Sequence, residues 1–117
     1  ASRSLLEQTG VPYVIENVQE ARAWLRSPIR LCGSQLAVPV RSHRYFEIAA
    51  DLPLVLMPGC AHRPDDASRD HGSKQTEAQF RDAMGCEWMT VVEARQAIPP
   101  AYTEHIGRQL LAALADK

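Results

Sequence analysis

The tripeptide Glu16-Asn17-Val18 places an acid directly after an apolar run. The run, Val11 to Ile15, is β-branched and aromatic, as is typical of a strand buried in a sheet. We expect this strand to be parallel to its neighbours, and the carboxyl end of a parallel strand faces the crevice in which open α/β sheets bind ligands. A glutamate there can be desolvated and can donate a proton to a substrate nitrogen. Glu16 is therefore a candidate catalytic acid, although strands also end in Glu simply because the following loop is wet.

A second candidate is the basic segment Arg41-Ser42-His43-Arg44, which leads into Tyr45-Phe46. A guanidinium at the mouth of a strand can form paired hydrogen bonds to a carbonyl, a phosphate or a carboxylate. The simpler interpretation is a salt bridge at the strand mouth. The segment by itself therefore favours no particular substrate.

The three cysteines, Cys32, Cys60 and Cys86, form no Cys-x-x-Cys pair. An odd number of widely spaced cysteines predicts reduced thiols and a cytoplasmic protein. The segment that most resembles a metal site is Cys60-Ala61-His62, with His71 and Cys86 further along the chain. Because structural zinc sites usually bring their ligands in closely spaced pairs, we predict no metal site and interpret these residues as a buried thiol and a loop histidine.

The elements that must position these residues follow an α/β pattern. We expect strands over 11–15, 29–32 and 44–48, separated by helical turns over 19–25 and 33–36. Helices are expected over 2–9, 74–84, from Thr90 and over 101–115. The predicted fold is a partial doubly wound, Rossmann-like sheet of about three strands with C-terminal helices. The first strand should have helices on both faces and an edge that another copy or another part of the protein covers.

Composition excludes several classes of protein. The chain has 117 residues, 45% of them hydrophobic and 23% charged, which describes one small globular domain or part of a larger one, and not a disordered or fibrous chain. No apolar run reaches the ~20 residues of a membrane span, and no signal peptide is apparent, so we expect no membrane partner. Thirteen basic and fourteen acidic residues exclude a strongly cationic nucleic-acid binder but leave room for a local positive patch.

Four segments follow one another in a fixed order: Tyr13 to Val18, Arg41 to Phe46, Met84 to Trp88, and Gln96 to Pro100 with Ile106-Gly107. In this order they resemble motifs in the C-terminal half of a DNA cytosine-5 methyltransferase of the compact bacteriophage and bacterial type. The first resembles the family's strand ending in Glu-Asn-Val, the second its Gln-x-Arg-x-Arg strand, the third a helix end, and the fourth its closing Pro-Pro…Ile-Gly motif. The resemblance covers the chain from Val11 to Leu114.

The resemblance implies an enzyme that flips a cytosine out of double-stranded DNA and methylates it with S-adenosyl-L-methionine. In the family a cysteine thiolate attacks ring carbon six, while the Glu of Glu-Asn-Val pairs with ring nitrogen three and the amino group. Carried over to this chain, the resemblance implies that the catalytic residues are Glu16 and Arg44. Arg44 would contact the base carbonyl and brace the acid. The substrate-binding residues are Asn17, which orders the turn, and Arg41; the cofactor-binding residues are Gln96, Ala97 and Ile98.

The family's Pro-Cys nucleophile and Phe-x-Gly-x-Gly loop do not occur in these residues, and Val40 and Ser42 stand where the family has Gln and Arg. The resemblance divides the chain into core strands over 1–50, a short loop over 51–74 in place of a target-recognition domain, and core helices over 75–117. We expect the chain to be inactive alone and to need an N-terminal methyltransferase half or a second copy of itself as a partner. The alternatives are a non-catalytic remnant that dimerises or binds nucleic acid, and an unrelated α/β domain.

Overall fold

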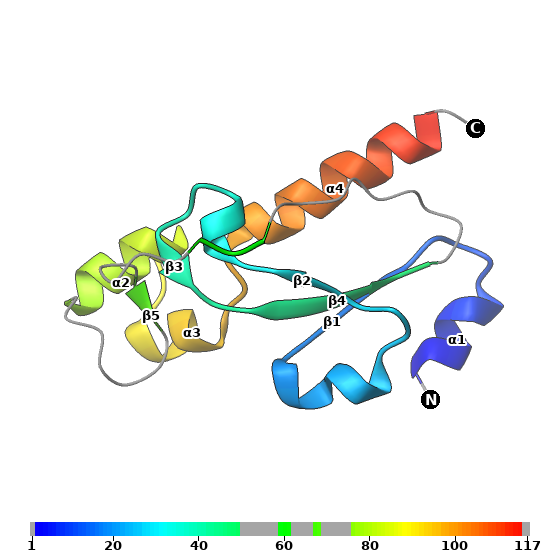
Figure 1. Cartoon of the computed structure of the whole chain (residues 1–117), viewed down its shortest axis with the longest axis horizontal. Coiled ribbons are helices and arrows are strands. Elements are labelled where there is room, and N and C mark those ends of the chain that lie inside the picture. The colour runs from blue at the N-terminus through cyan, green and yellow to red at the C-terminus, as the bar shows by residue number, and fades with distance from the viewer. Residues whose placement is uncertain (1, 50–58, 62–66, 69–75, 116–117) are drawn as a thin grey trace.

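A three-stranded antiparallel sheet lies at the centre of the structure, a computed structural model that describes residues 2–49, 59–61, 67–68 and 76–115 (Figure 1). Its strands are β1 (Val14–Asn17), β2 (Ile29–Leu31) and β4 (Arg44–Ile48), in the order β1-β4-β2. Since β4 runs antiparallel to both neighbours, β1 and β2 point in the same direction. Their carboxyl ends therefore meet beside the start of β4.

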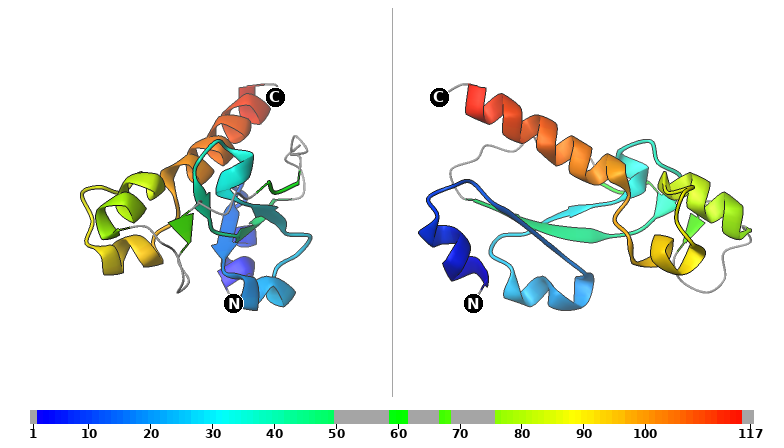
Figure 2. Two further views of the ribbon diagram at one scale, coloured as in Figure 1. Left: turned by 60° about the vertical axis from the view of Figure 1, so that its left-hand side comes forward. Right: turned by 180° about the vertical axis from the view of Figure 1, so that it is seen from behind.

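Helices lie on both faces of this sheet (Figures 1 and 2). The long helix α4 (Pro100–Ala115) packs Tyr102 and Ile106 against Leu31 and Phe46. The opposite face carries α1 (Ser2–Gln8) and the 3₁₀ helix η1 (Gln19–Trp24). Because side chains alternate along a strand, one set of β4 residues reaches α4 and the other reaches α1 and η1.

The α/β class and the three strands of the main sheet are confirmed, but the predicted parallel pairing of β1 is wrong. β1 is only partly buried: Asn17 is exposed, and Val14 packs against the core cluster on the α4 side of the sheet. An apolar run does not specify the direction of the neighbouring strand, so the residues could not reveal it. Among the described residues β1 pairs on one side only, as expected of a strand with an open edge; self-association through that edge stays a prediction.

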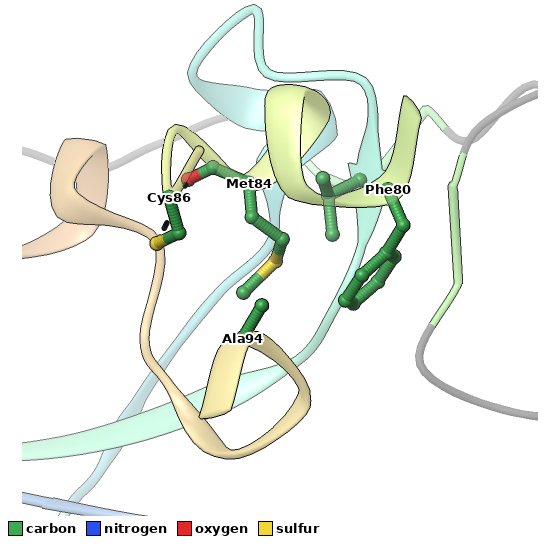
Figure 3. Packing of buried hydrophobic residues seen from close by; sticks show 5 residues of the cluster. Phe80, Met84, Cys86 and Ala94 are labelled. Carbon is green, nitrogen blue, oxygen red and sulfur yellow. Dashed lines mark hydrogen bonds between the residues drawn. The ribbon is translucent and has the colours of Figure 1, made fainter. Parts of the chain in front are cut away.

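A second, smaller group of elements adjoins the first. Strand β3 (Val40–Arg41) pairs in parallel with β5 (Ala67–Ser68), and the helices α2 (Glu77–Met84) and α3 (Val91–Gln96) pack beside them. Their shared core contains five buried side chains (Figure 3): Val40, Phe80, Met84, Cys86 and Ala94.

The ends of α2 follow directly from its sequence. Thr76 accepts a hydrogen bond from the backbone N–H of Gln79, and the Gln79 side chain returns one to Thr76, which completes a capping box. Gly85 ends the helix in the left-handed region with φ +78°.

Strand β5 lies within the segment 51–74, which was predicted to be a loop without a strand. Most of that predicted loop lies outside the described residues. Of the helices that the structure describes, none combines the length and the apolar composition that a bilayer crossing requires.

Candidate functional site

The carboxyl end of β1 and the amino end of β4, its antiparallel neighbour, bring Glu16 and Arg44 together. Arg44 Nε lies 3.8 Å from Glu16 Oε1, which makes an ion pair longer than a direct hydrogen bond. The Arg44 side chain is 4% exposed and that of Glu16 is 28% exposed. The arrangement is therefore a buried guanidinium beside a carboxylate that solvent can still reach.

The register of the sheet explains why these two side chains meet. Glu16 lies opposite Phe46, and residues directly opposite in an antiparallel pair share a face. Arg44 is two residues before Phe46 on the same strand, so it faces the same side. Both side chains therefore belong to the face that α4 covers, at the end of the sheet where that helix begins.

The Nε atom of Arg44 is buried and makes no hydrogen bond with any residue in the described ranges. A buried N–H donor that lacks an acceptor costs roughly 1–3 kcal/mol of stability. A carbonyl oxygen brought to this position by a ligand would remove that cost. Arg44 thus has the character of a binding residue as well as that of a partner for Glu16.

Tyr102 fixes the segment that leads into Arg44. Its hydroxyl donates a short hydrogen bond to the backbone carbonyl of Ser42, and both residues are buried. Burial, together with the nearby Cys32, raises the pKa of Tyr102, so the hydroxyl remains a donor throughout the physiological range. This bond ties the start of α4 to the residues immediately before β4.

The predicted substrate-binding residues lie in different surroundings. Asn17 is exposed at the end of β1, and its Oδ1 accepts a hydrogen bond from the backbone N–H of Val18 at 2.9 Å. It therefore orders the turn that follows Glu16. Arg41 is exposed on β3, which belongs to the smaller sheet and not to the sheet of Arg44. The structure does not bring Arg41 into the Glu16–Arg44 pair.

The predicted cofactor-binding residues connect α3 to α4. Gln96 is the exposed last residue of α3. Ala97 packs against the core cluster around Met84, and Ile98 packs against the cluster around Tyr102. Two of the three side chains therefore pack into the core.

Sequence reasoning missed a group of sulfur and nitrogen atoms near the same end of the sheet. Sγ of Cys32, Sγ of Cys60 and a ring nitrogen of His43 all lie within 4.8 Å of one another. The predicted neighbours of Cys60, His62 and His71, lie outside the described residues. The signal in the sequence was the position of Cys32 and His43 next to two predicted strands whose ends meet.

These groups do not form an activated nucleophile. Cys60 Sγ and His43 Nε2 are 3.5 Å apart, but burial and the neighbouring Cys32 raise the pKa of the Cys60 thiol. The thiolate is the reactive form of cysteine, so a raised pKa makes Cys60 a weak nucleophile at neutral pH. Cys86, the third cysteine, is fully buried in the core cluster of α2 and α3, where burial also raises its pKa.

No protein-family model, curated protein or solved structure shows significant similarity to this chain. The motifs and the geometry of the sheet end are therefore the grounds on which a function can be inferred.

Proposed function

We propose that this chain is the C-terminal segment of an S-adenosyl-L-methionine-dependent DNA cytosine-5 methyltransferase, in which Glu16 and Arg44 bind the flipped cytosine. The observation that carries the proposal is the 3.8 Å approach of these two side chains from separate strands. An acid at the carboxyl end of β1 and a guanidinium at the adjacent amino end of β4 are suited to a planar base that offers both donors and acceptors.

In the proposed complex the Glu16 carboxylate takes up a proton from solvent, donates it to ring nitrogen three of cytosine and accepts a hydrogen bond from the exocyclic amino group. Arg44 donates from its buried Nε to the base carbonyl, the acceptor that this atom otherwise lacks among the described residues. The Tyr102 hydrogen bond to Ser42 holds the strand entry that carries Arg44. Fixed donors of this kind stabilise the charge that develops on the ring during nucleophilic attack.

The nucleophile of the reaction must come from outside these residues. None of Cys32, Cys60 and Cys86 follows a proline, and the pKa values of the Cys60 and Cys86 thiols are raised. S-adenosyl-L-methionine supplies the methyl group in the family, and we assign no step to Gln96, Ala97 or Ile98. The proposed partners are double-stranded DNA and an N-terminal methyltransferase half, without which the chain is inactive.

The proposal places the three described strands in a larger, doubly wound sheet. In that arrangement the open edge of β1 pairs with a strand of the N-terminal half. The same edge would pair with a second copy of the chain if the protein were instead a non-catalytic dimerisation module. Catalysis distinguishes the two arrangements, because the edge of β1 is paired in both.

The test is methyl transfer by the chain combined with an N-terminal half that carries the Pro-Cys and Phe-x-Gly-x-Gly motifs. Transfer of labelled methyl groups from S-adenosyl-L-methionine to unmethylated DNA should require both halves. Glu16→Gln should lower the rate by about 10²–10⁴-fold, as expected for a lost proton donor. The matched control is Glu104→Gln, on the exposed side of α4, which should leave the rate unchanged. An assembled wild type that transfers no methyl groups, or an equally active Glu16→Gln variant, would overturn the proposal.

A further inference from the structure

We propose that Cys32, His43 and Cys60 form a binding site for a zinc ion. The three residues come from three separate parts of the chain: the end of β2, the turn before β4, and the described segment 59–61. Each offers one ligand atom, and all three atoms lie within 4.8 Å of one another. Two cysteine sulfurs and an imidazole nitrogen are a ligand set that zinc prefers.

The distances suit tetrahedral coordination. With Zn–S of ~2.3 Å and Zn–N of ~2.05 Å, a tetrahedral angle separates sulfur from nitrogen by about 3.6 Å. The observed separation between Cys60 Sγ and His43 Nε2 is 3.5 Å. The same geometry separates two sulfurs by about 3.8 Å, within the 4.8 Å limit of the group. A zinc ion therefore fits between the ligand atoms with small adjustments of their side chains.

Hydrogen bonds around the ligands support the same arrangement. The Ser34 hydroxyl, in the 3₁₀ helix η2 (Gly33–Gln35), donates to Cys32 Sγ at 3.3 Å. The backbone N–H of Ala61 donates in turn to the Ser34 oxygen at 3.0 Å. Such outer partners orient metal ligands and stabilise thiolates. They also join segment 59–61 to the end of β2 and bring Cys60 to Cys32.

The charges balance when zinc is bound. The two thiols release their protons to solvent as they coordinate, and His43 coordinates as neutral imidazole. Two thiolates and one Zn²⁺ leave no net charge, which suits a site in which Cys32 is fully buried and the other two ligands are half-buried. Water completes the fourth coordination position. Because His43 directly precedes Arg44, the ion would also fix the strand entry that carries the proposed base-binding arginine.

A cobalt titration of the full chain tests this site independently of the methyltransferase proposal. Co²⁺ added to the reduced, metal-free protein should give one equivalent of a tetrahedral complex, seen as intense visible bands with thiolate charge transfer. Zn²⁺ should displace it. Cys60→Ser and His43→Asn should each weaken binding at least tenfold. Cys86→Ala is the matched control, a cysteine in a separate core cluster, and it should bind with wild-type affinity.

Several outcomes would overturn the site. They are the absence of stoichiometric Co²⁺ or Zn²⁺ binding, the weak spectrum of an octahedral complex, and wild-type affinity in both the Cys60 and the His43 variants. Far-UV circular dichroism of each metal-free variant shows whether it folds. A second pair of variants, Cys32→Ala and His43→Gln, replaces any that does not fold, and the same tenfold weakening is expected of them.

Discussion

Glu47 provides a stability test of the sheet that carries the site. The residue is 1% exposed, and its carboxylate accepts hydrogen bonds from Arg3 at 2.8 and 2.6 Å, from the backbone N–H of Arg26 at 2.6 Å, and from the Tyr13 hydroxyl at 3.3 Å. The Arg3 hydrogen bonds, supported by that of Arg26, lower the pKa of Glu47 from 4.5 to about 2 against the opposing effect of burial. This network attaches α1 and the end of η1 to the face of β4 opposite to α4.

The change in pKa sets the size of the expected effect. A carboxyl whose pKa falls from 4.5 to about 2 on folding stabilises the protein by roughly 3 kcal/mol at pH 7. Arg3 is 24% exposed, and solvent screening lowers this contribution to about 1–3 kcal/mol. Because the folded pKa is the lower one, the stabilisation is complete above pH 4.5 and is lost as the pH falls towards 2. At pH 3 about two-fifths of it remains.

The assay is urea unfolding of wild type and Glu47→Gln, followed by circular dichroism at pH 7, 5 and 3. The free energies of unfolding should differ by about 1–3 kcal/mol at pH 7 and pH 5, and by less than half of that difference at pH 3. Glu104→Gln is the control; its exposed ion pair with Arg108 should contribute no more than about 0.5 kcal/mol. The reasoning would be refuted by a Glu47 variant as stable as wild type at pH 7, or by a difference that does not shrink at pH 3.

Two further predictions concern packing at the site, and both are measured by urea unfolding. Tyr102→Phe leaves the buried Ser42 carbonyl without its donor, so it should lower the free energy of unfolding by about 1–3 kcal/mol; an unchanged free energy would contradict the assignment of that bond. Gly33→Ala places a Cβ 2.3 Å from the Val40 carbonyl oxygen and should destabilise by about 1–3 kcal/mol. The control is Gly107→Ala, whose added Cβ has nothing within 4 Å, and it should raise the free energy of unfolding by roughly 0.5–1 kcal/mol. Equal effects of the two alanines would show that the contact between residue 33 and the Val40 carbonyl is unimportant.

Local patterns in the sequence were sufficient to locate most elements. The three strands of the main sheet occur where apolar and β-branched residues predicted them, and the end of α2 at Met84 and the cap at Thr90 agree with the prediction; the cap of α2 at Thr76 was not predicted. The family resemblance implies that Arg44 braces Glu16, and the two side chains lie 3.8 Å apart in the structure. The positions of the elements depend on residues that are neighbours in the chain.

Features that depend on distant contacts were not predictable. The direction of β4 between β1 and β2 is set by how the connections pack, which no short segment encodes. The grouping of Cys60 with Cys32 and His43 depends on distant contacts in the same way. The histidine nearest to Cys60 in the sequence is His62, whereas the structure supplies Cys32 and His43 from the ends of two different elements.

The most direct measurement is a double-mutant cycle on methyl transfer to DNA by the chain assembled with an N-terminal methyltransferase half. Glu16→Gln and Arg44→Gln are compared singly and together. Because both side chains are proposed to hold one cytosine, each single variant should lose most of the activity, and the double variant should lose little more. Transfer that survives in either single variant, or losses that simply multiply in the double variant, would contradict a shared role at the end of the sheet.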